Sequence, residues 1–126
     1  MTKQSFTITH RICMGHDYTF TFYCNVVESS DNIELITQST SKLCRWLDEN
    51  WNGKLMFWEE DKFIPSTLSE NELTIVPFQP TLENIGKYLA EEIVLPEGVS
   101  LTRVFVEETR KCSYVNQEDI RRFDEC

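Results

Sequence analysis

The sequence FTITHRICMGHDYTFTFYCNVV, residues 6–27, contains two runs in which apolar and polar side chains alternate. A period of two is typical of a β-strand with one buried face. Between the runs, Gly15-His16-Asp17 is typical of a turn. We therefore expect an antiparallel hairpin. The side chains on its buried face are Phe6, Ile8, His10 and Ile12 from the first run and Tyr18, Phe20, Phe22, Cys24 and Val26 from the second.

Apolar side chains recur at three- and four-residue steps in two later segments, which predicts two helices. The first covers about residues 34–51, and the second begins after Thr81, a residue type that caps helices. Residues 54–72 have no clean period and indicate a short strand followed by a loop. Residues 73–76 and 99–108 predict two further strands. Without the short strand in residues 54–72, the order is β, β, α, β, α, β, which indicates an α+β protein.

Composition narrows the class of protein. The 126 residues include 12 Lys plus Arg and 21 Asp plus Glu, which gives a formal charge of −9 at pH 7. This length predicts one domain, residues 1–126. Because an acidic chain repels phosphate backbones, we expect no nucleic-acid partner. No apolar stretch reaches the ~18 residues of a membrane span, so we expect a soluble, cytoplasmic protein without a membrane partner.

The chain has an odd number of cysteines and no CxxC pair, and it shows no secretion signal. This pattern favours reduced thiols over a disulfide framework or a zinc ribbon. The five residues are Cys13, Cys24, Cys44, Cys112 and Cys126.

Two histidines, His10 and His16, flank the predicted turn. A histidine on a strand is commonly a packed or surface residue, and this is one interpretation of both. The alternative is a metal site, because His10, Cys13 and His16 have the spacing His-x2-Cys-x2-His and are residue types that bind Zn²⁺. The pattern leaves both interpretations open.

Glu108 lies at the end of the last predicted strand, on the face shared by Val104 and Val106. A buried carboxylate there needs donors, either from an arginine or from a ligand with paired N–H groups, such as a guanidine-like heterocycle. The alternative is a glutamate turned toward water. Asp48 and Glu49 similarly suggest either a general-base pair or charges on the solvent face of a helix.

Taken in order, five short segments resemble the 6-pyruvoyltetrahydropterin synthase and 6-carboxytetrahydropterin synthase family, whose second type belongs to queuosine biosynthesis. The similarity extends from Phe6 to about Tyr114. The segments are residues 6–12, FTITHRI, similar to Phe-x-x-x-His-Arg-Leu; 14–18, MGHDY, similar to His-Gly-His-Asn-Tyr; 47–49, LDE, where the family has Leu-Asp-His; 77–84, PFQPTLEN, similar to Pro-Thr-x-Glu-Asn; and 106–109, VEET, similar to Val-x-Glu-Thr.

The resemblance implies the tunnelling fold, a four-stranded antiparallel sheet with two helices on one face. Such chains assemble into trimeric barrels that often stack as hexamers, with sites between subunits. It also implies that Glu108, with Thr109 beside it, binds the ring of a pterin or purine-type ligand, and that the reaction is a lyase step on dihydroneopterin triphosphate.

The residues that match the family's metal site differ from its pattern. The family binds Zn²⁺ with three histidines, which correspond here to His10, Met14 and His16. A thioether has little affinity for Zn²⁺, so His10 and His16 remain as metal ligands and we expect zinc binding to be weak or absent. Replacing Met14 by histidine is expected to strengthen zinc binding.

The residues that match the catalytic pattern differ as well. The loop that holds the family's catalytic cysteine is shortened here to Arg11-Ile12-Cys13, and Glu49 replaces the catalytic histidine. Asp48, which would orient that histidine, is kept. Each proton-transfer group typically contributes ~10²–10⁴ in rate, so these changes should nearly abolish the parent reaction. Cys13, Asp48 and Glu49 are the candidate catalytic residues if activity remains.

Three functions fit the sequence. The first is a pterin-forming lyase with a rearranged centre. The second is a catalytically inactive homologue that binds a pterin or purine through Glu108, or serves only in assembly. The third is a different reaction on a purine-derived substrate. Metal analysis separates the first from the second, and product analysis separates the first from the third.

Overall fold

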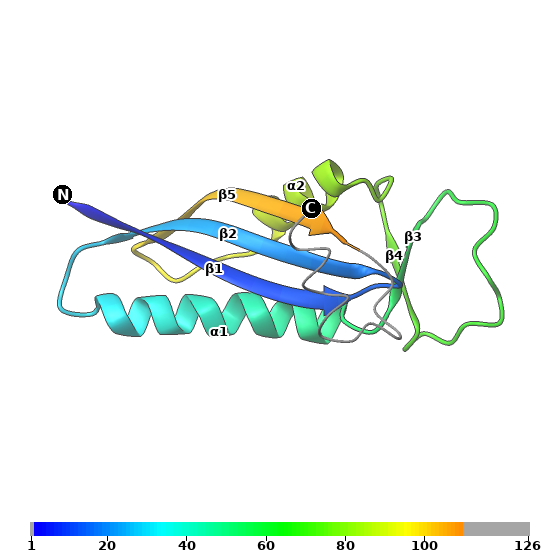
Figure 1. Cartoon of the computed structure of the whole chain (residues 1–126), viewed down its shortest axis with the longest axis horizontal. Coiled ribbons are helices and arrows are strands. Elements are labelled where there is room, and N and C mark those ends of the chain that lie inside the picture. The colour runs from blue at the N-terminus through cyan, green and yellow to red at the C-terminus, as the bar shows by residue number, and fades with distance from the viewer. Residues whose placement is uncertain (1, 110–126) are drawn as a thin grey trace.

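Two long strands form the predicted hairpin in the computed structural model, which describes residues 2–109 (Figure 1). They are β1 (Lys3–Cys13) and β2 (Asp17–Val27), paired antiparallel. His10 lies opposite Phe20, and Ile8 lies opposite Phe22. The alternating apolar side chains therefore share one face, as the sequence period predicted.

The last strand, β5 (Val99–Glu108), pairs antiparallel with the other side of β2, so the sheet order is β1-β2-β5. Its register shifts at a bulge, where Tyr23 opposes Arg103 but Cys24 opposes Leu101. The extra residue is Thr102, whose hydroxyl donates to the Tyr23 carbonyl at 2.9 Å. The bulge turns Leu101 toward the core, so the alternation of side chains between the two faces is interrupted at this point of the predicted strand.

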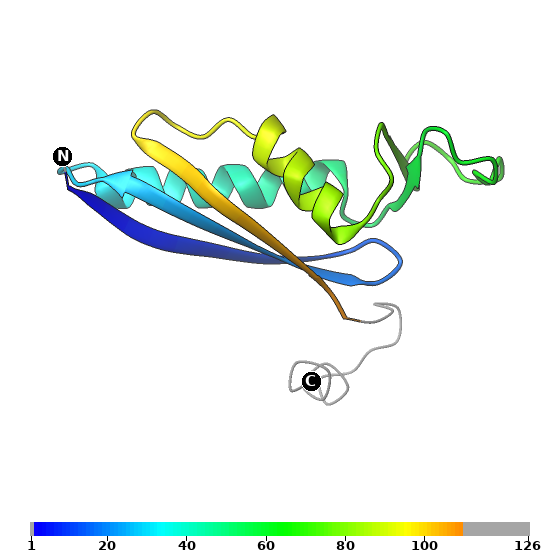
Figure 2. The same cartoon turned by 90° about the horizontal axis from the view of Figure 1, so that it is seen from above.

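Both helices lie on the same face of this sheet (Figure 2). They are α1 (Asn32–Asn50) and α2 (Leu82–Glu92), and Thr81 caps α2 as predicted, its hydroxyl accepting from the Asn84 N–H at 3.1 Å. The two-helix, one-face arrangement is therefore confirmed. The side chains that fill the space between the layers and are least exposed include Phe20, Phe22, Leu43, Leu47, Ile85 and Leu89.

Two short strands lie outside the main sheet. β3 (Leu55–Trp58) and β4 (Leu73–Val76) pair with each other in parallel. They form a small separate sheet next to the loop drawn at the right of Figure 1. The described residues thus form an α+β protein with a three-stranded antiparallel sheet. The 73–76 run forms a strand as predicted, but it does not join the main sheet.

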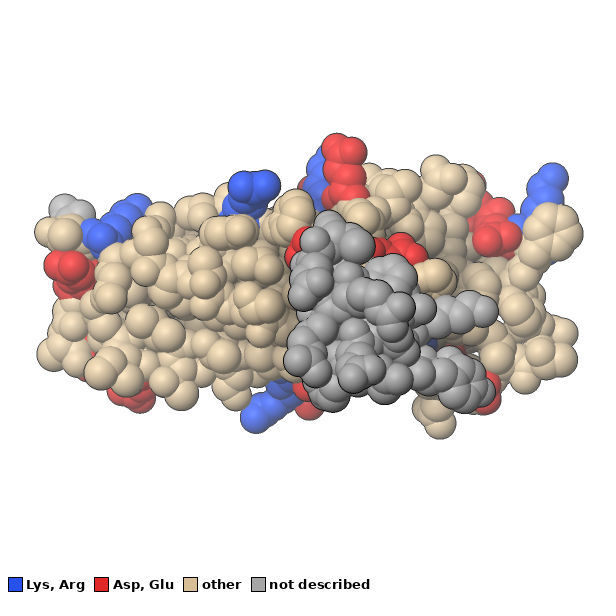
Figure 3. Space-filling model, in the orientation of Figure 1, with Lys and Arg blue, Asp and Glu red and all other residues tan. Residues whose placement is uncertain are grey.

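The face of the main sheet opposite the helices is the one seen in Figure 3, where uncharged side chains dominate the left half and charges lie toward the rim. On β5, the Arg103 guanidinium lies 5.5 Å from the ring centroids of both Tyr23 and Phe105, within the range of a cation–π contact. Within residues 2–109, no helix is both long and apolar enough to cross a membrane.

Candidate functional site

The turn between β1 and β2 places His16 beside the end of β5. Gly15 has φ +81°, a conformation that other residues rarely adopt, and the Met14 N–H donates to the His16 carbonyl at 2.9 Å. Directly after β5, the Thr109 N–H donates to the Asp17 carbonyl at 2.9 Å. The hairpin turn and the end of β5 are therefore held together.

A first pair of side chains joins the turn to β5. His16 Nδ1 lies 2.8 Å from Glu108 Oε1, and the two side chains are 45% and 35% exposed. Glu108 points to the helix side of the sheet because it lies directly opposite Tyr18 in the β2–β5 ladder. The predicted face is therefore correct. Of the two alternatives for its burial, the structure favours the glutamate that reaches water, because β5 ends here and the carboxylate lies at the rim of the sheet.

Tyr18 is the other neighbour of this carboxylate. Burial and the nearby Glu108 carboxylate, which interacts with its hydroxyl, raise the pKa of Tyr18 to about 12. The phenol therefore keeps its proton across the physiological pH range and acts as a donor. A carboxylate has about four acceptor positions, so contacts with His16 and Tyr18 leave capacity for a ligand.

A second histidine–carboxylate pair joins β1 to the end of α1. His10 Nε2 lies 2.8 Å from Asp48 Oδ1, and the side-chain amide of Asn52 donates to the same oxygen at 3.2 Å. The Asn52 side-chain oxygen accepts from the Cys13 backbone N–H at 3.0 Å. Asp48 thus orients the His10 imidazole, and Asn52 fixes both to the end of β1.

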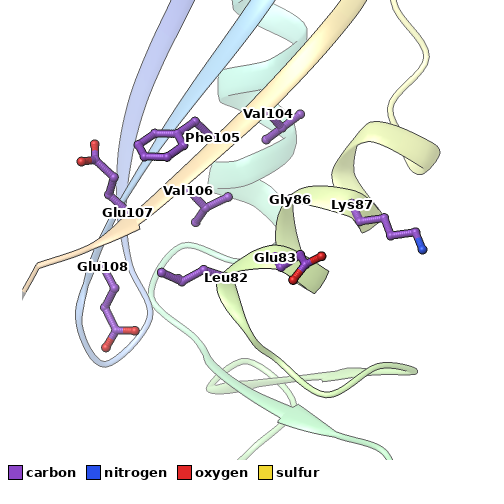
Figure 4. Close-up of a pocket in the computed structure, with 9 residues that line it drawn as sticks. All are labelled: Leu82, Glu83, Gly86, Lys87, Val104, Phe105, Val106, Glu107 and Glu108. Atoms are coloured by element: carbon purple, nitrogen blue, oxygen red, sulfur yellow. The ribbon is translucent and has the colours of Figure 1, made fainter.

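A groove begins beside Glu108 and follows the outer edge of β5 along α2 (Figure 4). Its volume is about 580 Å³. Val104 and Val106 point from β5 toward α2, where Gly86 faces them, and Leu82 lies near Glu108. A Cβ added at Gly86 would lie 3.4 Å from Val106 Cγ2, so the missing side chain allows the close approach of helix and strand. The groove thus has an apolar floor with a carboxylate at one end.

The predicted metal ligands are held separately. His10 is paired with Asp48 and His16 with Glu108, and among residues 2–109 no three His, Cys, Asp or Glu side chains come together as a metal site. Met14 is 5% exposed and belongs to the apolar core. The described residues therefore do not offer the three-ligand set that a protein Zn²⁺ site needs. Zinc binding, and its gain on replacing Met14 by histidine, stay predictions.

The predicted catalytic residues Cys13, Asp48 and Glu49 do not form one cluster. Cys13 is disulfide-bonded, so the prediction of a reduced thiol is wrong for this residue. Asp48 is paired with His10, whereas Glu49 lines a shallow depression with other side chains of α1, including Arg45 and Trp46. These two neighbours differ in direction because successive residues point to different sides of a helix.

The other cysteines divide into two groups. Cys24 and Cys44 are free thiols, as predicted, and burial raises the pKa of Cys24 to about 11. A thiol with so high a pKa is a poor nucleophile at neutral pH. Cys112 and Cys126 lie outside the described residues.

Comparisons with models of protein families, with curated proteins and with solved structures give no significant match for this chain. The site must therefore be interpreted from its own geometry. Two of its residues were missed by sequence reasoning. Tyr18 carries a signal, because strand alternation places it on the same face as Phe20 and hence near Glu108. For Asn52 the sequence offers only its spacing as a signal. It lies four residues after Asp48, and side chains four residues apart are neighbours on a helix.

Proposed function

We propose that this protein binds a small heterocycle of pterin or purine type, with Glu108 accepting hydrogen bonds from the ring. One observation carries the proposal: the Glu108 carboxylate lies at the end of an apolar-floored groove of about 580 Å³. Ligand pockets of this size commonly combine apolar walls with a few fixed polar groups. An amino–imino edge presents two parallel N–H donors, which match a carboxylate in the way that a guanidinium does.

The neighbours of Glu108 support this role. The carboxylate is oriented by His16 at 2.8 Å and lies opposite Tyr18, so its position is fixed before a ligand arrives. A fixed acceptor loses little conformational entropy on binding, which favours affinity. The apolar floor made by Val104, Val106 and Gly86 suits the apolar face of an aromatic ring.

Binding receives more support than a lyase reaction on dihydroneopterin triphosphate, the activity that the family resemblance implies. The rearranged centre would need Cys13, a histidine pair and Glu49 around one substrate. Glu49 instead lines a depression on α1, and each histidine is paired with a different carboxylate. Proton transfer requires a group within hydrogen-bond reach of the reacting atom, and these groups do not converge within one chain.

Titration calorimetry with neopterin, guanine and guanosine tests the proposal. Removing one partner of a buried charge-assisted contact commonly costs ~2–5 kcal/mol. Because Glu108 lies at the rim, we expect the lower end of that range, so Glu108→Ala should weaken the best ligand by more than tenfold. Glu108→Gln, which keeps the shape but offers one oxygen instead of two, should lose nearly as much.

Glu107→Gln is the matched comparison. This neighbouring carboxylate points to the opposite side of the strand, so its loss should change affinity much less (Figure 4). Circular dichroism should show that all three variants keep the fold. If none of the ligands binds the unmodified protein, or if Glu108→Ala binds them equally well, the assignment is wrong.

Assembly into trimers or hexamers with a tunnelling-fold barrel is a second proposal, and it is compatible with the first. The observation that favours it is the order β1-β2-β5, which leaves both outer strands of the described sheet without a neighbour on one side. Strand edges of this kind readily pair with another chain. Light scattering at micromolar concentration should then give a trimer or hexamer mass, and a monomer would contradict the proposal.

A further inference from the structure

The charges around the groove affect whether it binds a phosphorylated or an unphosphorylated heterocycle. Beside the apolar floor, the charged side chains of residues 2–109 that line the groove are the carboxylates Glu83, Glu107 and Glu108 and the ammonium group of Lys87. A triphosphate ester carries about four negative charges and is usually bound by arginine and lysine clamps or by a metal ion. Three carboxylates against one ammonium group make an unfavourable field for such a tail. The formal charge of the whole chain, −9, adds to the repulsion.

Besides Lys87, the N-terminus of α2 is a feature of the described groove that attracts anions in general, because helix N-termini present unpaired N–H groups. Here its first turn is already satisfied in part. The Thr81 hydroxyl accepts from the Asn84 N–H at 3.1 Å, and Glu83 supplies a negative charge in that turn. The hydrogen bond uses one of the N–H groups that could bind a phosphate, and the Glu83 charge repels a phosphate.

We propose that the groove beside Glu108 selects an unphosphorylated heterocycle and discriminates against its triphosphate ester. The inference rests on the proposed function and narrows it to a class of ligand. A neutral ring with adjacent N–H donors meets the apolar floor and the Glu108 acceptor. The same ring with a triphosphate tail must bring that tail close to Glu83 on α2. A phosphorylated compound would therefore be a poor substrate or ligand for this site.

Two pairs of probes that differ only in phosphate content test this: neopterin with neopterin triphosphate, and guanosine with guanosine triphosphate. Calorimetric titration at low ionic strength should give a triphosphate affinity at least about tenfold below that of the unphosphorylated partner. Adding salt should narrow the gap, since screening weakens repulsion between exposed charges.

Glu83→Lys should raise the affinity for the triphosphate about tenfold and leave the affinity for neopterin nearly unchanged. Glu83→Gln, which removes one charge without reversing it, should give a smaller increase. Glu92→Lys is the matched control, because it makes the same charge change on α2 at a residue that does not line the groove. Thermal unfolding checks that each variant is folded.

The outcomes separate this inference from the proposed function. If a triphosphate binds the unmodified protein as tightly as its unphosphorylated partner, the inference is overturned while ring binding stands. If Glu92→Lys raises triphosphate affinity as much as Glu83→Lys, net charge is responsible instead of the groove, and the inference is again overturned. If no probe binds, the proposed function fails and the inference fails with it.

Discussion

Replacing Phe20 by alanine is expected to lower the free energy of unfolding by about 3–5 kcal/mol. Phe20 is fully buried on the central strand β2. Its ring centroid lies 6.4 Å from that of Phe22 and 6.3 Å from that of Trp51. The substitution removes apolar surface and also leaves a cavity beneath both helices, which the surrounding side chains can fill only in part.

Urea denaturation followed by circular dichroism measures the loss. Phe63→Ala is the matched control, because the Phe63 side chain is 85% exposed. Its replacement should change the free energy of unfolding by no more than about 0.5 kcal/mol. Equal losses for the two variants would show that the sheet and helices do not pack as described.

The role of Phe20 follows from the sequence because strand alternation is a local property. Each side chain on β2 points to the face opposite its neighbour, so the order of apolar residues identifies the buried face without knowledge of the partner strand. The helix cap at Thr81 is equally local, since a hydroxyl there needs only the N–H three residues later. These features were predicted and are confirmed.

The features that sequence reasoning missed depend on partners distant in the chain. The bulge at Thr102 becomes visible only in the register with Tyr23 and Cys24. A hint was present, because Leu101 and Val104 are both apolar but three residues apart, which breaks a period of two. The parallel pairing of β3 with β4 is fixed by contacts such as the Leu55 N–H to the Glu72 carbonyl at 2.8 Å, which no local pattern specifies.

The candidate site was predicted in part. Strand period gave the face of Glu108, but the exposure of a strand's last residue depends on how far the covering helix extends. The pairing of His10 with Asp48 joins residues 38 positions apart. Sequence spacing around one turn instead offered two interpretations, packed or surface histidines and a shared metal site. Pairs formed through tertiary packing are not encoded in spacing, and this is why the carboxylate partners were missed.

Replacing Gly15 by valine is expected to lower the free energy of unfolding by about 2–4 kcal/mol. A left-handed backbone costs an ordinary residue about 1–2 kcal/mol, and a branched side chain at φ +81° is less favourable still. Crowding adds a smaller cost, because a Cβ at Gly15 would lie 2.9 Å from Leu55 Cδ2, the end of a partly exposed side chain that has to move aside. The turn that places His16 beside Glu108 would then be strained at its centre.

Gly53→Val provides the control for the backbone alone. Gly53 has nearly the same φ, +82°, but nothing lies within 4 Å of its added Cβ. Gly53→Val should therefore lower the free energy of unfolding less than Gly15→Val does. The difference between the two losses measures the contribution of the contact with Leu55. Because Leu55 is 38% exposed, Leu55→Ala costs little by itself and should recover about 1 kcal/mol in the Gly15→Val background. If the double-variant cycle shows no coupling, crowding contributes nothing and backbone strain alone explains the requirement for glycine in this turn.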